Sequence, residues 1–160
     1  MLETRPNLAL LRRAIELSRV HSSAGEGGPF GAVIASGDSI VAEGWNQVFS
    51  TCDPTAHAEI VAIRRATARR REVSLAGCVI YASAEPCPMC LAAIHWARLD
   101  AVYFAAGRDD AAAVGFDDAR LYDEVRRPLA ERQLPTSQWL REEAAAVITA
   151  WGQSPRSVLY

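Results

Sequence analysis

The sequence predicts an α/β protein, a three-layer α/β/α sandwich around a mixed, mostly five-stranded sheet. Short apolar runs alternate along the 160 residues with stretches of helical periodicity. Strands that follow one another with a helix between them favour parallel crossovers, which place helices on both faces of one sheet. Half of the residues are hydrophobic, so residues 1–160 have the length and composition of a single domain with its own core.

The first third of the chain predicts one helix followed by a pair of strands. Apolar residues recur at helical spacing over residues 8–20, which favours an amphipathic helix, and the glycine-rich stretch 25–29 ends it. The apolar runs 32–35 and 40–43 flank a Gly-Asp pair at positions 37 and 38. This turn chemistry predicts a hairpin of adjacent strands.

The middle of the chain predicts two helices that begin next to proline. Asp53 and Thr55 carry N-cap signals on either side of a proline. They place His57 and Glu59 in the first turn of a helix. Two further prolines in the sequence P-C-P-M-C precede a second predicted helix over residues 90–96. Both motifs are therefore expected at helix N-termini.

The remaining elements complete the sheet and its cover. Apolar runs predict strands over residues 78–82 and 101–105. Helices are expected over 122–130 and 137–151. The stretch 131–140 is the position left for a fifth strand, although it offers little strand-forming sequence.

Three side chains from the two motifs form a candidate zinc site. The sequence H-A-E supplies His57, and P-C-P-M-C supplies Cys87 and Cys90. One imidazole and two thiolates fill three corners of a tetrahedron around Zn²⁺ and leave the fourth to water, which is typical of a catalytic site. Helix N-termini favour anions, which lowers thiol pKa values and helps both cysteines bind as thiolates. We expect one Zn²⁺ per subunit.

Glu59 is the candidate catalytic residue, because it lies two residues beyond His57 and is left for proton transfer. Zn²⁺ lowers the pKa of a bound water to about 7. A carboxylate beside it can take the proton and pass it to a ring nitrogen and then to a departing amine, typically worth ~10²–10⁴-fold in rate. The pattern H-x-E…P-C-x-x-C is the motif of zinc deaminases, and it predicts hydrolytic loss of an exocyclic amine.

Other interpretations of the cysteines stay open. A C-x-x-C pair that follows a strand and opens a helix is also typical of thioredoxin-like redox sites, which would leave His57 and Glu59 without a role. A structural zinc with Cys52 or Cys78 as fourth ligand would leave the carboxylate unused. The spacing of Cys52 and Cys78 does not make a second zinc-ribbon pair.

The charge balance argues against a nucleic-acid partner. The formal net charge is −2, and all 17 basic residues are arginine. Five of them fall within residues 64–71, at the end of the first predicted ligand helix. Cations there interact favourably with the negative end of the helix dipole. We interpret this run as a solvated helix face in preference to an RNA-binding surface.

The sequence also predicts where the protein is located and what the histidines outside the motifs do. No stretch approaches membrane-spanning length, and charged residues interrupt the first twenty positions, so we expect neither a membrane partner nor a signal peptide. Four cysteines, two of them candidate ligands, fit the reducing cytoplasm better than a disulfide scaffold. His21 and His95 lie outside the motifs, and we expect ordinary structural roles for them.

Several segments resemble the cytidine deaminase superfamily. They are G-G-P-F-G-A-V over residues 27–33, Asn46, D-P-T-A-H-A-E over 53–59 and E-P-C-P-M-C-L over 85–91. Within the superfamily the sequence is most similar to bacterial guanine deaminases. The segments that carry this narrower resemblance are I-H-W-A-R over 94–98, G-F-D-D over 115–118, Tyr122 and Tyr160.

The resemblance implies a set of substrate-binding residues, namely Asn46, Asp118, Phe30, Trp96, Ala58 and Tyr160. Asn46 and Asp118 match residues that hydrogen-bond the purine, and Asp118 would serve the face that carries N–H donors. Phe30 and Trp96 match aromatic pocket walls. From the residues alone, core packing of both aromatics and a helix cap at Asp118 stay open.

The resemblance also implies an assembly and a substrate. The assembly is a homodimer that exchanges segments of about 137–160, with Tyr160 laid over the partner's site. The substrate is a small nucleobase, guanine, converted to xanthine and ammonia. Guanosine, another aminated purine, a pterin or a triazine are close alternatives. A tRNA adenosine deaminase, which needs a basic surface, and a zinc-stabilised scaffold without turnover are the more distant ones.

Overall fold

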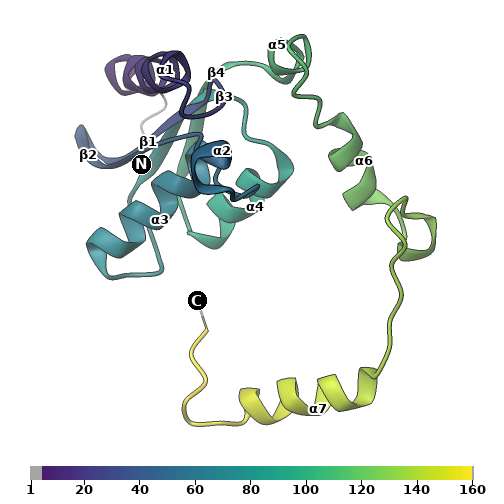
Figure 1. Cartoon of the computed structure of the whole chain (residues 1–160). Helices are drawn as coiled ribbons and strands as arrows, with labels where there is room; N and C mark the ends of the chain where they lie inside the picture. Colours follow the sequence, from purple (N-terminus) through teal and green to yellow (C-terminus); the bar gives the residue numbers. More distant parts are fainter. Residues whose placement is uncertain (1–4, 160) are drawn as a thin grey trace. The chain divides into compact units, whose positions relative to one another are not determined.

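The computed structural model describes residues 5–159. Its contacts divide the chain into two compact units, Met1–Asp118 and Ala119–Tyr160. The first unit holds the sheet and all elements that carry the two motifs (Figure 1).

Four strands form the sheet of the first unit in the order β2-β1-β3-β4. Their bounds are Gly31–Ser36 for β1, Ser39–Trp45 for β2, Val79–Ala84 for β3 and Ala101–Ala106 for β4. β1 runs antiparallel to both β2 and β3, whereas β3 and β4 are parallel. The mixed sheet and the predicted hairpin are confirmed, and Gly37 takes the positive φ of 54° that the hairpin turn needs.

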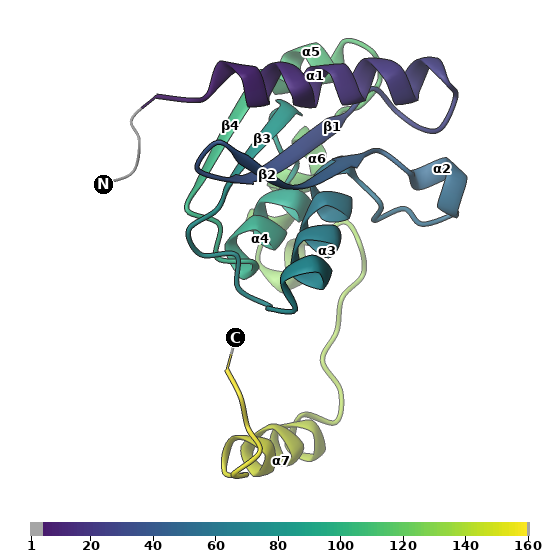
Figure 2. The same ribbon diagram turned by 90° about the vertical axis from the view of Figure 1, so that its left-hand side faces the viewer.

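Helices cover both faces of this sheet (Figure 2). Helix α1 (Leu8–Ser23) packs on one face, where Val33 and Tyr81 join its apolar side. Helix α3 (Ala58–Arg70) packs on the opposite face, where Ile34 and Ile80 belong to the core. Adjacent residues of β1 and β3 thus point to opposite cores, as strand geometry requires. The predicted three-layer α/β/α architecture is confirmed.

Both ligand-bearing helices begin at a metal-binding motif. His57 is the N-cap of α3, and Cys87 is the N-cap of α4 (Pro88–Trp96). The Asp53 cap signal was wrong in detail, because its carboxylate accepts the backbone N–H of Thr55 at 2.8 Å and closes a turn before the helix begins. The short helices α2 (Val48–Thr51) and α5 (Arg108–Ala112) complete the unit.

The second unit is helical. It contains α6 (Ala119–Arg126), a 3₁₀ turn (Leu129–Glu131) and α7 (Arg141–Gly152). The fifth strand expected over 131–140 does not form, so the sheet has four strands within residues 5–159. The Glu124 carboxylate accepts the backbone N–H groups of Gln133 and Leu134 at 3.1 and 3.0 Å. Donors that a strand would use in a ladder are therefore bound to a side chain.

Among the helices that the structure describes, none has both the length and the apolar character needed to cross a membrane.

Candidate metal centre and active site

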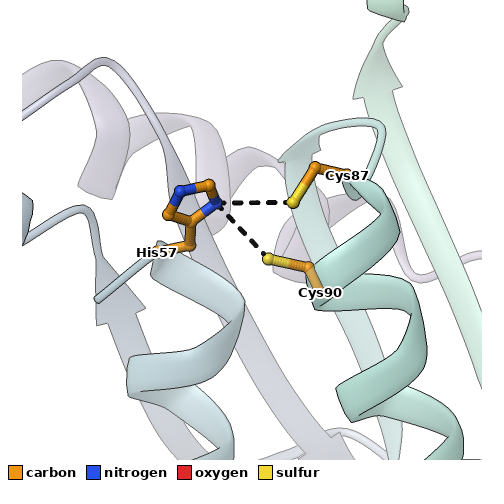
Figure 3. A group of neighbouring side chains, drawn as sticks. All are labelled: His57, Cys87 and Cys90. Atoms are coloured by element: carbon orange, nitrogen blue, oxygen red, sulfur yellow. Dashed lines mark hydrogen bonds between the residues drawn. The ribbon is translucent and has the colours of Figure 1, made fainter. Parts of the chain in front are cut away.

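The three predicted metal ligands converge from two helix N-termini (Figure 3). His57 precedes α3, while Cys87 and Cys90 lie in the first turn of α4. Their ligand atoms all lie within 4.8 Å of one another. The structure thus brings His57 together with two cysteines that lie 30 and 33 positions further along the sequence, as the motifs predicted.

The distances in this cluster fit a tetrahedral zinc ion. Nδ1 of His57 lies 3.5 Å from Sγ of Cys87 and 3.6 Å from Sγ of Cys90. Zn–N bonds of about 2.0–2.1 Å and Zn–S bonds of about 2.3 Å, at a tetrahedral angle, place nitrogen and sulfur about 3.5 Å apart. Among the described residues this is the one such group of potential ligands, and it excludes Cys52 and Cys78. The described residues therefore supply three ligands to this cluster, and the fourth corner of the tetrahedron has no ligand from among them.

The electrostatics of the cysteine pair also call for a cation. Hydrogen bonding from Cys90 and His57 lowers the pKa of Cys87 to about 4. The resulting thiolate, together with burial, raises the pKa of Cys90 far above its ordinary value. One sulfur thus ionises readily and the second resists, because two anions this close repel each other. A divalent cation that contacts both sulfurs removes this resistance.

Glu59 lies in the first turn of α3, immediately beside the ligands, and is 8% exposed. Desolvation by burial raises the pKa of its carboxyl, and the neighbouring Cys87 thiolate adds to this effect. A hydrogen bond links its side chain with that of Cys90. A buried carboxyl beside the metal ligands, with its pKa raised above the ordinary value, is placed to take up and release protons, as acid–base catalysis requires.

Asn46 is buried at the end of β2, next to the loop that precedes β1. Its Oδ1 accepts the backbone N–H of Gly28 at 3.1 Å and that of Val48 at 3.3 Å. A carboxamide oxygen has two acceptor positions, and these two bonds fill them. Any hydrogen bond from Asn46 to a ligand is therefore a donation from its Nδ2.

Phe30 and Asp118 lie in the same unit as the ligands. Phe30 is half-buried and meets Phe116 edge to face, with ring centroids 4.9 Å apart. Partial burial raises the pKa of the Asp118 carboxyl, and the negative charge of Cys87 adds to this, whereas Arg108 opposes it. Asp118 is thus close enough to Cys87 to feel its charge. Phe116, a member of the G-F-D-D segment, had no predicted role of its own.

The other predicted substrate residues differ in what the structure says of them. Ala58 is fully buried at the first position of α3, where a helix leaves its N–H groups without intrahelical acceptors. Trp96 ends α4 and is 62% exposed, six residues beyond Cys90, which is about 9 Å along a helix axis. Its place in the pocket stays a prediction. Tyr160 lies outside the described residues.

Two glycines that were not predicted as site residues, Gly44 and Gly27, allow close backbone packing next to the site. A Cβ on Gly44 would lie 2.2 Å from the carbonyl oxygen of Ala58 and 2.6 Å from the backbone nitrogen of Ala62. A Cβ on Gly27 would lie 2.1 Å from the carbonyl oxygen of Asn46. Backbone approaches this close need glycine. The sequence signal for each was its position: Gly44 lies at the end of one predicted strand, and Gly27 precedes another.

Comparison with known proteins agrees with this geometry. Residues 5–106 match the family model of the cytidine and deoxycytidylate deaminase zinc-binding region. A guanine deaminase of Bacillus subtilis is 48% identical over 141 residues, which cover 88% of this chain and 90% of that protein. A tRNA-specific adenosine deaminase of Haemophilus influenzae is 36% identical over 118 residues, covering 70% and 68%.

A solved structure has the same fold. The crystal structure of guanine deaminase from Bacillus subtilis superposes with a TM-score of 0.93 at 44% identity, covering 98% of this chain and 99% of that one. Fold and metal cluster together define a zinc-dependent aminohydrolase of the cytidine deaminase type. The chain belongs to the cytidine and deoxycytidylate deaminase family.

Proposed function

We propose that this protein hydrolyses guanine to xanthine and ammonia. The observation that carries the proposal is the pairing of a three-ligand metal cluster with the buried carboxyl of Glu59. A closed structural zinc site would need a fourth protein ligand, and the cluster contains three. The similarity to the Bacillus subtilis guanine deaminase supports guanine as the substrate.

Each residue of the site has a defined task in this reaction. His57, Cys87 and Cys90 would hold a zinc ion, which would supply Lewis acidity and lower the pKa of water to about 7. Glu59 accepts the proton of the attacking water and delivers it to the ring nitrogen. It then takes a second proton from the hydroxyl group that has added to the ring carbon and delivers it to the exocyclic amine, so that the C–N bond breaks, the carbonyl forms and ammonia leaves.

Hydrogen-bonding complementarity supports a purine in this pocket. Asn46 has only its Nδ2 donor to offer, which fits an acceptor atom on the purine edge. The Asp118 carboxylate fits the N–H donors that guanine carries. Phe30, braced by Phe116, provides an aromatic wall against which a planar base can pack.

The arginines of α3 support a free base over RNA. Arg64 pairs with Asp53 at 3.1 Å. Arg65 and Arg69 donate to backbone carbonyls of β2 at 3.0 Å. Arg70 contacts the Cys78 sulfur at 2.9 Å. These cations already have local acceptors, whereas an RNA-binding surface presents them to phosphates.

Steady-state kinetics with the zinc-loaded protein test the substrate. Guanine, guanosine, a pterin and an amino-triazine are compared by ammonia release, and a tRNA substrate is tested for inosine formation. We expect guanine to have the highest kcat/KM. A preference for guanosine would contradict the assignment of the free base as substrate. Deamination of tRNA that weakens with salt would identify a tRNA deaminase instead. No turnover with any substrate would indicate a zinc-stabilised scaffold.

We also propose a cytoplasmic homodimer in which copies exchange segments of about 137–160. The support is the apolar surface of the second unit, where Trp139, Val147, Ile148 and Leu159 are each more than two thirds exposed. None of the described residues of this unit is buried, so a second copy is the occupant that would cover it. Light scattering should give twice the chain mass, and a monomer at micromolar concentration would refute the dimer.

A further inference from the structure

The Glu26 carboxylate fastens the loop between α1 and β1 to its surroundings. Oε2 of Glu26 lies 2.8 Å from Nε1 of Trp45, which donates to it, and 2.9 Å from Nδ1 of His21. Trp45 is the last residue of β2, and His21 lies in the last turn of α1. One oxygen atom thus joins the loop to a helix and to a strand end.

Trp45 is itself fixed from both faces. The imidazole of His21 stacks on its ring with centroids 3.7 Å apart and planes inclined by 2°. The guanidinium of Arg65, from α3, lies 4.3 Å from the centroid of the Trp45 ring. The same arginine donates to the carbonyl of Glu43 at 3.0 Å. The indole N–H therefore has little freedom, and it holds Glu26 in a defined position.

The loop held by Glu26 forms the surroundings of Asn46. Gly28 donates its N–H to Oδ1 of Asn46 at 3.1 Å, and Asn46 donates its own N–H to the carbonyl of Phe30 at 3.0 Å. Gly27 approaches Asn46 so closely that no Cβ fits between them. A shift of the loop must therefore move Asn46 and Phe30, two of the proposed purine contacts.

We propose that Glu26 is a positioning residue of the substrate pocket, acting through Trp45 and the loop that carries Gly27, Gly28 and Phe30. Glu26 lies on a different element from the zinc ligands and Glu59. It therefore sets how the base is held, and leaves the proton transfer to Glu59. The kinetic part of this proposal depends on the proposed function, since it takes Asn46 and Phe30 as contacts of guanine.

Substitution of Glu26 separates positioning from general stability. In zinc-loaded Glu26→Ala we expect KM for guanine to rise about tenfold or more, kcat to change much less, and zinc content to stay at the wild-type level. Glu26→Gln should restore KM, because its amide oxygen can accept both N–H groups that now share Oε2. Glu16→Ala is the matched control, since Glu16 is also a surface carboxylate with a side-chain partner on α1, Arg19.

A second variant tests the donor. Trp45→Phe keeps an aromatic ring between His21 and Arg65 but removes the Nε1 donor. We expect it to raise KM like Glu26→Ala, and the double variant to add little, because both changes remove the same hydrogen bond. Additive effects of the two substitutions would contradict the proposal.

Hydrogen exchange gives a readout that needs no activity. The N–H groups of Gly28 and Asn46 should exchange faster in Glu26→Ala than in wild type, and should be unchanged in Glu16→Ala. If Glu26→Ala keeps wild-type KM and exchange, the proposal is overturned, even where its melting temperature falls. Absence of guanine turnover in wild type refutes the proposed function, while the exchange experiment still decides the role of Glu26.

Discussion

Replacing Gly44 with alanine tests whether the close packing of α3 on β2 holds the metal centre in place. The added Cβ would lie 2.2 Å from the carbonyl oxygen of Ala58 and 2.6 Å from the backbone nitrogen of Ala62. Both neighbours are backbone atoms of α3, so no side chain can rotate away. Ordinary contact begins at 3.4 Å, which means that α3 must shift by about 1 Å.

That shift has two measurable consequences. Overpacking of this kind costs about 1–3 kcal/mol in free energy of unfolding. Because α3 begins next to His57 and carries Glu59, the same shift displaces a ligand and the proton carrier, and a misplacement of 1 Å can cost about 100-fold in rate. We expect weaker zinc binding and a loss of that order in kcat/KM for guanine.

Urea unfolding, zinc titration and steady-state kinetics measure these effects in parallel. Gly107→Ala is the matched control, because a Cβ there meets only Oδ2 of Asp110, at the ordinary contact distance of 3.8 Å. It should keep wild-type zinc affinity and activity. If Gly44→Ala also keeps wild-type zinc affinity and activity, close packing of α3 on β2 is not needed to position the metal ligands. The packing interpretation would then be refuted.

Three further predictions concern the loop, the ion and acid stability. Gly27→Ala should raise KM for guanine in kinetic assays, because its Cβ would lie 2.1 Å from the carbonyl oxygen of Asn46; an unchanged KM would refute that contact. Removal of zinc by a chelator should abolish ammonia release and lower the melting temperature, and added Zn²⁺ should restore both; activity without metal would refute the zinc role. The Arg13 guanidinium lowers the pKa of the Glu43 carboxyl from its ordinary 4.5, so the pair stabilises the fold above that pH and loses this effect as pH falls through the lowered pKa. Glu43→Gln should therefore lower the free energy of unfolding by about 0.5–1 kcal/mol at pH 7, with the difference vanishing in acid; a difference independent of pH would contradict this.

The metal cluster could be predicted from sequence because its signals are local. Imidazole and thiolate ligands, prolines beside helix starts and apolar strands all occur within short segments, and each predicts its own structure. His57, Cys87 and Cys90 therefore met where the motifs placed them. The order of strands and helices was predictable for the same reason.

Features that depend on distant partners could not be predicted. The need for glycine at 44 arises only when α3 lies on β2, and no pattern within either element contains it. Where a fifth strand was considered, the Glu124 carboxylate takes backbone donors nine and ten residues away, and no local pattern indicates these bonds. His21 has the structural role that was expected, but its partners, the Trp45 ring and the Glu26 carboxylate, were not predicted. Such contacts follow from tertiary packing alone.

The most direct test of the account is ammonia release from guanine by zinc-loaded Glu59→Gln. We predict wild-type zinc content for this variant, because Glu59 is not among the metal ligands. We also predict a rate of ammonia release lower by ~10²–10⁴-fold, because the variant lacks the group that transfers the proton. Glu72→Gln, just beyond the end of the same helix, should behave like wild type. Ammonia release by Glu59→Gln at the wild-type rate would contradict the account.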